Sequence, residues 1–416
     1  MDGMMTARGT KLVLAGAALL AAAAPAEAKW ITSWSAAPVN PMPAFGPFPA
    51  TPSYTNRTFR QTLRLSAGGS AFRIRISNAY GTEPLEIGAA RIAILDDAGQ
   101  EVSGSSRTIR FGGAGRALVE QGALIVSDAI ALPVAPLARL SVSLYLPGET
   151  GPCTCHQTAL DEMEISAPGD HTAAPFKPDA KSANRIGLSA VEVDAPQGAQ
   201  TVVVLGDSIS DGVGSTQSGN RRWPDFLAER LAKRGGGAWG VANQGISGNR
   251  VLQDGMGVSA LARLDRDVLS VPGVKTMILF EGINDINLSF GTPATPPGTK
   301  SPLPSRKIDA DDIIAAYRQI VARAHAQGIR VFGATIAPYK GLPTWNAGGE
   351  AARQKVNAFI RTGGAFDAVL DFDKVFADPK DPQSIRADYH MGDHLHGNDA
   401  SYRAVADSID LGLFGK

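Results

Sequence analysis

The amino-acid sequence predicts an α/β protein in which an antiparallel β-sandwich of jelly-roll type precedes an α/β unit with a parallel sheet. Two observations predict this fold class. From about residue 30 to about residue 180, apolar and polar residues alternate with a period of two. From about residue 198, short apolar runs alternate with helical periods. We therefore place a β-sandwich domain at residues 29–190 and an α/β domain at residues 198–416.

Residues 1–28 have the features of a secretory signal peptide. Arg8 and Lys11 precede an apolar run over residues 12–24, and Ala26-Glu27-Ala28 supplies a small-residue cleavage motif. The run is too short to span a bilayer core of roughly 30 Å, and its length suits the apolar region of a signal peptide. We predict that residues 1–28 are removed and that the protein is exported to the periplasm or the medium. No later segment reaches transmembrane length.

Within residues 29–190, the alternation is clearest in three segments. It runs through Thr58–Leu65, Phe72–Ser77 and Leu140–Leu146, and glycine-containing breaks such as residues 67–69 separate segments of this kind. Strict alternation is typical of half-buried antiparallel strands. Many short strands with turn signals between them predict the β-sandwich.

From residue 198 onward, sequence patterns typical of strands alternate with patterns typical of helices. We expect strands at 201–205, 276–280, 331–336 and 368–372, and helices at 224–234, 309–327, 350–361 and 400–413. Such alternation predicts a parallel sheet with helices on both faces. Ligands of these sheets bind beyond the carboxyl ends of the strands. Trp223, at the start of a predicted helix, is expected in the core.

The charge and cysteine content limit the classes of partner and the redox chemistry. The 416 residues include 40 Lys and Arg and 40 Asp and Glu, so the formal net charge is zero. With no basic cluster, charge gives no argument for nucleic acid or an anionic membrane as a partner. Export permits a disulfide between Cys153 and Cys155, although one intervening residue makes a strained ring.

In the stretch Val202–Ser215, a predicted buried strand ends just before a serine. Apolar residues run into Gly206-Asp207-Ser208, and small and polar residues follow. Ser208 can act as a nucleophile if a base activates it and if donors stabilise the oxyanion of the intermediate. Gly-Asp-Ser is also common in ordinary turns, so the rest of the chain must supply the base and the donors.

A candidate base lies near the C-terminus, between Asp388 and Asn398. Asp393 and His396 stand in D-x-x-H spacing, which lets one short loop present a carboxylate to the imidazole that it orients. By spacing alone, His390 or His394 can serve as the base instead. The crowding of His and Asp residues also fits a metal site, and it fits a surface loop with solvated histidines.

Two further stretches can donate hydrogen bonds to an oxyanion. Asn243–Asn249 is a glycine-rich loop that can bring backbone N–H groups close to a ligand. Gly282–Asp285 follows a predicted strand, and the Asn284 side-chain amide has hydrogens to donate. Each stretch also fits a turn closed by Asn or Asp. We expect Asp207 and Asp285 to support turns rather than to react.

Together these blocks resemble the SGNH (GDSL) hydrolase family. The four family blocks match Gly206-Asp207-Ser208, Gly248 five residues after Asn243, Gly282–Asp285 as G-x-N-D, and Asp393 with His396 as D-x-x-H. All four occur in the family's order between residues 201 and 400. The resemblance implies a flavodoxin-like three-layer α/β/α fold, ester hydrolysis without metal or cofactor, and His396 as the base. The chain has no G-x-S-x-G motif, the signature of the α/β-hydrolase fold.

The region before residue 198 is similar to the region that precedes the catalytic domain in exported bacterial SGNH esterases of the XynE-like group. That group is described as arylesterases or acylhydrolases. The matching residues are Trp34, Arg60-Gln61, Ser77–Leu85 and Ser127-Asp128. Thr154-Cys155-His156 departs from the group, in which an aromatic residue is expected at the middle position.

These observations predict an exported serine esterase. Ser208 attacks the ester carbonyl, His396 takes its proton, and Asp393 orients the imidazole. The oxyanion hole consists of the backbone N–H groups of Ser208 and Gly248 and the Asn284 amide. We expect short acyl or acetyl esters of carbohydrate or aryl alcohols as substrates, with no cofactor, no metal and no nucleic acid partner.

Three alternatives stay open at this point. The first is a lipase or lysophospholipase, the second a metal-dependent hydrolase that uses the histidine-rich stretch, and the third a non-catalytic glycan-binding protein that uses the β-sandwich. A Pro-, Gly- and Thr-rich stretch at residues 291–307 leaves the strand end beside Asn284. A structureless connection of that length is usually functional, and we expect it to line the acyl or alcohol pocket.

Overall fold

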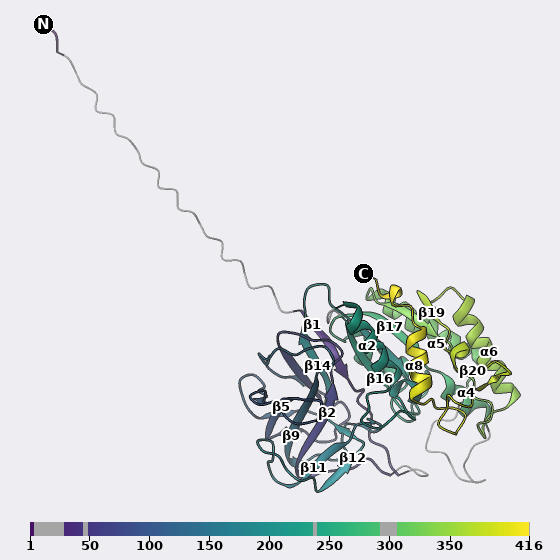
Figure 1. The fold of residues 1–416 in the computed structure, drawn as a ribbon, viewed down its shortest axis with the longest axis horizontal. Coiled ribbons are helices and arrows are strands. Elements are labelled where there is room, and N and C mark those ends of the chain that lie inside the picture. Colours follow the sequence, from purple (N-terminus) through teal and green to yellow (C-terminus); the bar gives the residue numbers. More distant parts are fainter. Residues whose placement is uncertain (4–28, 45–48, 236–238, 292–305, 416) are drawn as a thin grey trace.

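The computed structural model describes residues 1–3, 29–44, 49–235, 239–291 and 306–415. The predicted signal peptide, apart from its first three residues, and most of the predicted loop at 291–307 therefore lie outside the described residues. From β1 (Trp30–Ser35) to β14 (Leu188–Asp194), the regular elements of the described chain are all strands, and from β15 (Gln200–Gly206) onward strands and helices alternate. In Figure 1 the labelled strands β2, β5, β9 and β11 gather on one side of the molecule and the labelled helices on the other.

Two antiparallel sheets dominate the first part of the chain. The four-stranded sheet has the order β1-β14-β3-β8, and its strands are β1 (Trp30–Ser35), β14 (Leu188–Asp194), β3 (Phe72–Ser77) and β8 (Leu124–Val126). The six-stranded sheet has the order β12-β11-β2-β9-β5-β6, and its strands are β12 (Ala180–Ser182), β11 (Met163–Pro168), β2 (Thr55–Arg64), β9 (Arg139–Glu149), β5 (Ala89–Leu95) and β6 (Arg107–Thr108). The three segments with the clearest alternation are confirmed as β2, β3 and β9.

The two sheets share one hydrophobic cluster. Ile74 and Val191 are register partners in the four-stranded sheet, and both are fully buried. Phe59 and Val142 bring the buried residues of the six-stranded sheet into the same cluster. Alternate side chains of each strand therefore point into a common apolar core, which is the physical consequence of the period-two pattern. Two short pairs complete this part: β4 (Leu85–Ile87) with β7 (Ala117–Val119), and β10 (Cys155–His156) with β13 (Arg185–Ile186).

The second part is built on a parallel sheet with the order β16-β15-β17-β18-β19. Its strands are β15 (Gln200–Gly206), β16 (Trp239–Gly245), β17 (Val274–Phe280), β18 (Arg330–Ala334) and β19 (Ala368–Leu370). In order of appearance the strands are arranged 2-1-3-4-5, which is the flavodoxin-like arrangement. The sequence analysis missed β16 and assigned the start of residues 243–249 to a loop. This was wrong for Asn243–Gly245, which form the end of β16.

Helices cover both faces of this sheet. Val203 and Leu205 of β15 pack in a cluster with α3 (Ala260–Leu264), α4 (Ile283–Phe290), α5 (Ala310–Ala326) and α6 (Ala347–Thr362). Val202 and Val204 point the other way, into a cluster with α2 (Trp223–Gly235), α7 (Phe372–Phe376) and α8 (Asp399–Ser408). The continuous apolar run of β15 is therefore explained by burial on both faces, which is the rule for parallel strands.

The helices at 224–234, 309–327 and 350–361 are confirmed with small shifts, whereas the last one is shorter than predicted. It ends at Ser408 because Ile409 and Asp410 are extended, and a 3-10 turn follows at Leu411–Phe414. The predicted strand at 368–372 ends at Leu370. Trp223 is fully buried in α2, as expected. The remaining elements are α1 (Ser208–Asp211), a π-helical turn (Asp265–Leu269), and a short pair of β20 (Ala377–Asp378) with β21 (Asp381–Ile385).

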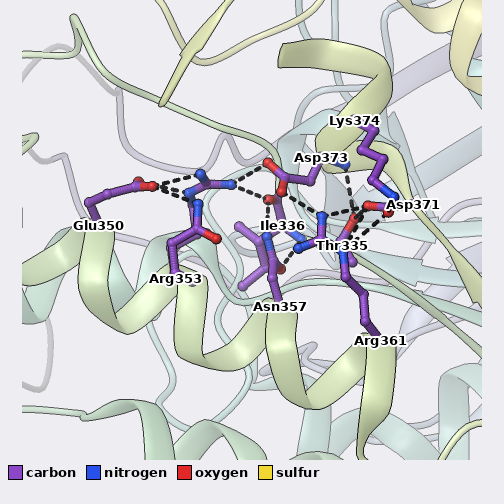
Figure 2. A network of polar contacts seen from close by, with 10 residues as sticks. Thr335, Ile336, Glu350, Arg353, Asn357, Arg361, Asp371, Asp373 and Lys374 are labelled. Carbon is purple, nitrogen blue, oxygen red and sulfur yellow. Dashed lines mark hydrogen bonds and ion pairs between the residues drawn. The ribbon is translucent and has the colours of Figure 1, made fainter. Parts of the chain in front are cut away.

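A buried polar network holds α6 to the segment that follows β18. Arg353 is fully buried, and its guanidinium contacts the carboxylates of Glu350 at 2.8 Å and Asp373 at 2.5 Å. It also donates to the carbonyl of Ile336 at 2.8 Å. Asn357 bonds both backbone groups of Ile336, and Figure 2 shows Arg353 and Asn357 of α6 pointing toward Ile336 in the segment directly after β18. The network fixes the carboxyl end of β18.

The two parts of the chain are joined by buried hydrogen bonds along β1 and β16. The Thr32 N–H donates to Thr201 Oγ1 at 3.0 Å, and the Val241 N–H donates to Ser66 Oγ at 2.8 Å. These bonds link the first part of the chain to the parallel sheet at β15 and at its edge strand β16. Within the described ranges, no helix is both long and apolar enough to cross a membrane.

Candidate active site

Ser208 lies at the carboxyl end of the central strand β15. The strand ends at Gly206, and Asp207 caps the short helix α1 by accepting a hydrogen bond from the Ile209 N–H at 2.9 Å. Ser208 is the first residue of α1, and Gly212 ends that helix in the left-handed conformation. A short helix with its first residue at a strand end holds the serine side chain at the rim of the sheet, where ligands of such folds bind.

The three predicted oxyanion donors follow three adjacent strands. Gly206 of β15 is the register partner of Gly245 in β16 and of Phe280 in β17, so these strands end at one level. Ser208, Gly248 and Asn284 come two, three and four residues after those ends. Level strand ends therefore bring together donors that are far apart in the sequence.

Gly248 needs to be glycine. It has a φ of +77°, and a Cβ at this position would lie 2.6 Å from the sulfur of Met256. Among the described residues, the backbone N–H groups of Gly248 and Ser208 donate no hydrogen bond. Asn284 uses one amide hydrogen on the Asn249 carbonyl, at 2.8 Å, which leaves its second amide hydrogen for a ligand. The arrangement can offer three donors to a developing negative charge.

A hydrogen-bonded chain connects Ser208 to His396 and Asp393. Ser208 Oγ lies 2.9 Å from His396 Nε2, and His396 Nδ1 lies 2.5 Å from Asp393 Oδ2. The other oxygen of Asp393 accepts from the N–H groups of Leu395 and His396, at 3.0 and 2.9 Å. The D-x-x-H loop therefore folds back on itself, and the carboxylate holds both the backbone and the ring of the histidine.

The charge of Asp393 is secured by its hydrogen bonds. Burial acts to raise the pKa of this carboxyl. The bonds from the His396 ring and from the two backbone N–H groups outweigh burial and hold the pKa well below its usual range. An ionised Asp393 keeps a proton on His396 Nδ1 and leaves Nε2 free to accept from Ser208.

His390 and His394 lie elsewhere in the same loop. His390 Nδ1 accepts from the Gly392 N–H at 3.0 Å, and the centroids of the His390 and His394 rings are 4.4 Å apart. Burial and the neighbouring His394 lower the pKa of His390. Of the three histidines that spacing allowed, His396 is the one hydrogen-bonded to Ser208. Within the part of the chain that the structure describes, no group of three or more His, Cys, Asp or Glu side chains is arranged to hold a metal ion.

Residues 204–404 match the model of the GDSL-like lipase/acylhydrolase family. This part of the chain is a GDSL-like lipase/acylhydrolase domain. The protein is accordingly a carboxylic ester hydrolase. A comparison with curated proteins finds no sequence match.

Solved structures similar to this chain cover about half of it. A lipolytic protein of the G-D-S-L family from Desulfitobacterium hafniense is 18% identical, with a TM-score of 0.37, over 50% of this chain and 97% of that one. An acetyl xylan esterase is 23% identical, with a TM-score of 0.37, over 50% and 96%. The aryl esterase of Mycobacterium smegmatis is 16% identical, with a TM-score of 0.38, over 50% and 96%.

Three buried carboxyl groups lie beneath the active-site edge of the GDSL domain. Burial, opposed by the hydrogen bond from the Ile209 N–H, raises the pKa of Asp207 to about 7. Burial also raises the pKa of Asp285 to about 6, although its carboxylate accepts from the N–H of Val251 at 2.7 Å. Burial and the nearby Asp207 raise the pKa of Glu281 well above its usual value. Asp207 and Asp285 thus support the local backbone, as expected from the sequence.

The sequence analysis missed a buried arginine that ties the strand ends together. Arg263 of α3 donates to the carbonyls of Gln244 at 2.7 Å and Gly206 at 3.2 Å, and to the Asn249 side chain at 3.0 Å. Its charge is balanced by Asp267 at 3.0 Å, one helical turn away. Arg263 has no local motif to mark it, because its partners come from two strands and a loop.

Proposed function

We propose that the protein is an exported serine esterase that hydrolyses short acyl esters through an acyl-enzyme intermediate. The observation that carries the proposal is the hydrogen-bonded chain from Ser208 through His396 to Asp393. A serine hydroxyl 2.9 Å from an imidazole nitrogen, with a carboxylate on the far side of the ring, is the arrangement that makes serine nucleophilic.

In the first half of the reaction, Ser208 Oγ attacks the ester carbonyl carbon while its proton passes to His396 Nε2. The resulting imidazolium is stabilised by Asp393, which stays ionised. The carbonyl oxygen becomes an oxyanion and accepts from the N–H groups of Ser208 and Gly248 and from the Asn284 amide. Collapse of this intermediate expels the alcohol, which takes the proton from His396.

In the second half, water takes the place of the alcohol. His396 removes a proton from the water, the acyl carbon is attacked again, and the acid leaves with Ser208 Oγ regaining its proton. The same three donors serve both oxyanions. Every step uses side chains and backbone N–H groups of the chain itself together with water, and the proposed mechanism requires no cofactor or metal.

Features of the whole chain support the proposed substrate class and location. The sequence of residues 1–28 and the disulfide between Cys153 and Cys155 support export to an oxidising compartment. Ser208 is only 4% exposed, which favours a compact acyl group. We propose acetyl or other short acyl esters of carbohydrate or aryl alcohols, and a β-sandwich of the XynE-like type formed by the two antiparallel sheets that share one core.

The test is hydrolysis of p-nitrophenyl acetate, butyrate and octanoate by the mature protein and by Ser208→Ala, each with and without a chelator. The wild type is expected to prefer acetate and butyrate. The variant is expected to lose a factor of roughly 10⁴–10⁶ in kcat, because it has no nucleophile. Chelator is expected to change neither rate.

Each alternative has its own result in this experiment. A preference for octanoate would indicate a lipase, and loss of wild-type activity with chelator would indicate a metal-dependent hydrolase. Activity that survives in Ser208→Ala would show that the serine is not the nucleophile. If neither protein hydrolyses any ester while glycan binding is retained, the binding-protein alternative holds instead.

A further inference from the structure

A histidine from the first part of the chain reaches into the GDSL domain. His156 belongs to β10, directly after the disulfide Cys153–Cys155, and its ring is buried. Its Nε2 lies 2.9 Å from Asp211 Oδ1, and its Nδ1 lies 2.9 Å from the Ala37 carbonyl oxygen. Because a carbonyl can only accept, Nδ1 carries a proton, and the ring is held between a fixed backbone group and Asp211.

Asp211 connects the nucleophile helix to the loop that carries Gly248. It is the last residue of α1, three residues after Ser208, and it is 2% exposed. Its Oδ2 accepts from both the N–H and the hydroxyl of Ser247, at 2.9 and 2.7 Å. Ser247 directly precedes Gly248, so Asp211 holds the residue whose following peptide unit carries the Gly248 N–H.

The Gly248 loop is therefore anchored on both sides. On one side Arg263 holds the Asn249 side chain at 3.0 Å, and that anchor lies wholly within the GDSL domain. On the other side Asp211 holds Ser247, and Asp211 is itself held by His156 from outside the domain. Removal of His156 would leave the buried carboxylate of Asp211 without its ring partner and free to turn away from Ser247.

We propose that His156 is a positioning residue of the active site, which acts through Asp211 and Ser247 to aim the Gly248 N–H at the oxyanion. This inference rests on the proposed role of Gly248 in the esterase reaction. It gives the antiparallel β region a part in the chemistry of the GDSL domain. A donor displaced by a fraction of an ångström stabilises the transition state less while substrate binding is barely changed.

The experiment compares full-length His156→Phe and His156→Gln with the wild type on p-nitrophenyl acetate. His171→Phe is the matched control, because His171 lies in the same part of the chain and, among the described residues, its ring has one hydrogen-bond partner, the Pro168 carbonyl at 3.4 Å. We expect His156→Phe to lower kcat by about 10–100-fold, part of the roughly 10²–10³-fold effect of losing one oxyanion donor. KM is expected to stay within about threefold, and His171→Phe to match the wild type.

Two readouts separate positioning from general structural damage. His156→Gln should recover a large part of kcat, because its amide can donate to Asp211. The double variant His156→Phe/Asp211→Ala should be no slower than Asp211→Ala alone, because both substitutions break one link. Additive losses, or a kcat for His156→Phe within twofold of the wild type, would overturn the proposal.

If His156→Phe does not fold, Ser247→Ala tests the proposed positioning role instead. It removes one of the two bonds from Ser247 to Asp211 on a half-buried residue, and we expect kcat to fall by about threefold to tenfold with KM unchanged. Wild-type kcat in both Ser247→Ala and His156→Gln would then overturn the inference. Ser208→Ala, measured in parallel, shows separately whether the proposed serine mechanism itself stands.

Discussion

At the scale of single residues, burial and hydrogen bonds set the charges around Ser208. The pKa of Asp393 is held low by three donors, so this carboxylate keeps its charge beside His396. The pKa values of Asp207 and Asp285 are raised by burial, and these groups lie next to the same strand ends. The pKa values of carboxyl groups around one site are thus shifted in opposite directions. Hydrogen bonds dominate at Asp393, whereas shielding from water dominates at Asp207 and Asp285.

The raised pKa of Asp285 predicts a pH dependence of stability. Because the pKa of Asp285 is about 6 in the folded chain and the ordinary pKa of an aspartate is 3.8, the folded state binds more protons than the unfolded chain between these two pH values. Stability contributed by this group is therefore lost as pH rises from about 4 to about 6, by up to roughly 3 kcal/mol. Asp285→Asn cannot ionise, so its free energy of unfolding should fall less than that of the wild type over this window.

Urea unfolding of both proteins at pH 4, 5, 6 and 7 measures this difference. The amide oxygen introduced by Asp285→Asn can still accept from the Val251 N–H, so the variant is expected to fold. A constant difference in the free energy of unfolding across the four pH values would show that Asp285 ionises in the folded protein as it does in the unfolded chain.

At the scale of elements, the segments that follow the strand ends are held by the helices beneath them. The loop with Gly248 is tied to α3 by Arg263, and the chain that follows β18 is tied to α6 by Arg353 (Figure 2). Both arginines are almost completely buried, and both bond backbone carbonyls as well as carboxylates. Such buried charges need all of their partners, since a charge without a partner in the interior is costly.

Arg353→Met is expected to destabilise the protein by about 3–5 kcal/mol, because Glu350 would stay buried without its counter-ion and Asp373 would keep only Arg361, at 2.7 Å. The matched control on the same helix is Lys355→Met, whose ion pair with Asp311 is exposed to solvent. We expect the control to change the free energy of unfolding by less than about 1 kcal/mol. Equal effects of the two substitutions in denaturant unfolding would contradict this interpretation of the network.

At the scale of the whole molecule, the antiparallel β region and the GDSL domain share a polar, close-packed interface. The buried Thr32 N–H of β1 donates to the Thr201 hydroxyl of β15, and His156 bonds Asp211 at the proposed active site. Gly240 of β16 lies against β1, and a Cβ at this position would lie 2.1 Å from the Thr32 carbonyl oxygen. Contacts of this kind cannot form unless both parts are folded, so we expect the two parts to unfold together.

Gly240→Ala should separate β1 from β16. Because the added methyl group would overlap backbone, we expect a loss of about 1–3 kcal/mol in the free energy of unfolding and a lower kcat, since β16 leads into the Gly248 loop. Gly115→Ala is the control, because a Cβ there meets nothing within 4 Å. Calorimetry and ester hydrolysis of the three proteins test this, and a Gly240→Ala protein as stable as Gly115→Ala would refute the close contact.

The sequence by itself determined the local features of this protein. Alternation predicted strands such as β2, β3 and β9, and apolar runs predicted β15 and β17, because side-chain burial repeats with the period of the backbone. Each of the four blocks that contain Ser208, Gly248, Asn284 and Asp393 with His396 lies within one turn or loop, and their resemblance to the SGNH hydrolase family implied ester hydrolysis. The family match over residues 204–404 agrees with those blocks.

Only the tertiary structure decided which distant residues meet. Strand β16 was not predicted, because its short run of small and polar residues has no marked hydrophobic period. Its place in the sheet is set by pairing with β15. Spacing alone left three histidines as candidate bases and the family resemblance implied His396, which is the one that the structure places in a hydrogen bond with Ser208. His156 and Asp211 are 55 residues apart in the chain, and Arg263 is 57 residues from Gly206. Contacts between residues so far apart in the sequence depend on how whole sheets and helices pack. No local sequence pattern encodes that packing.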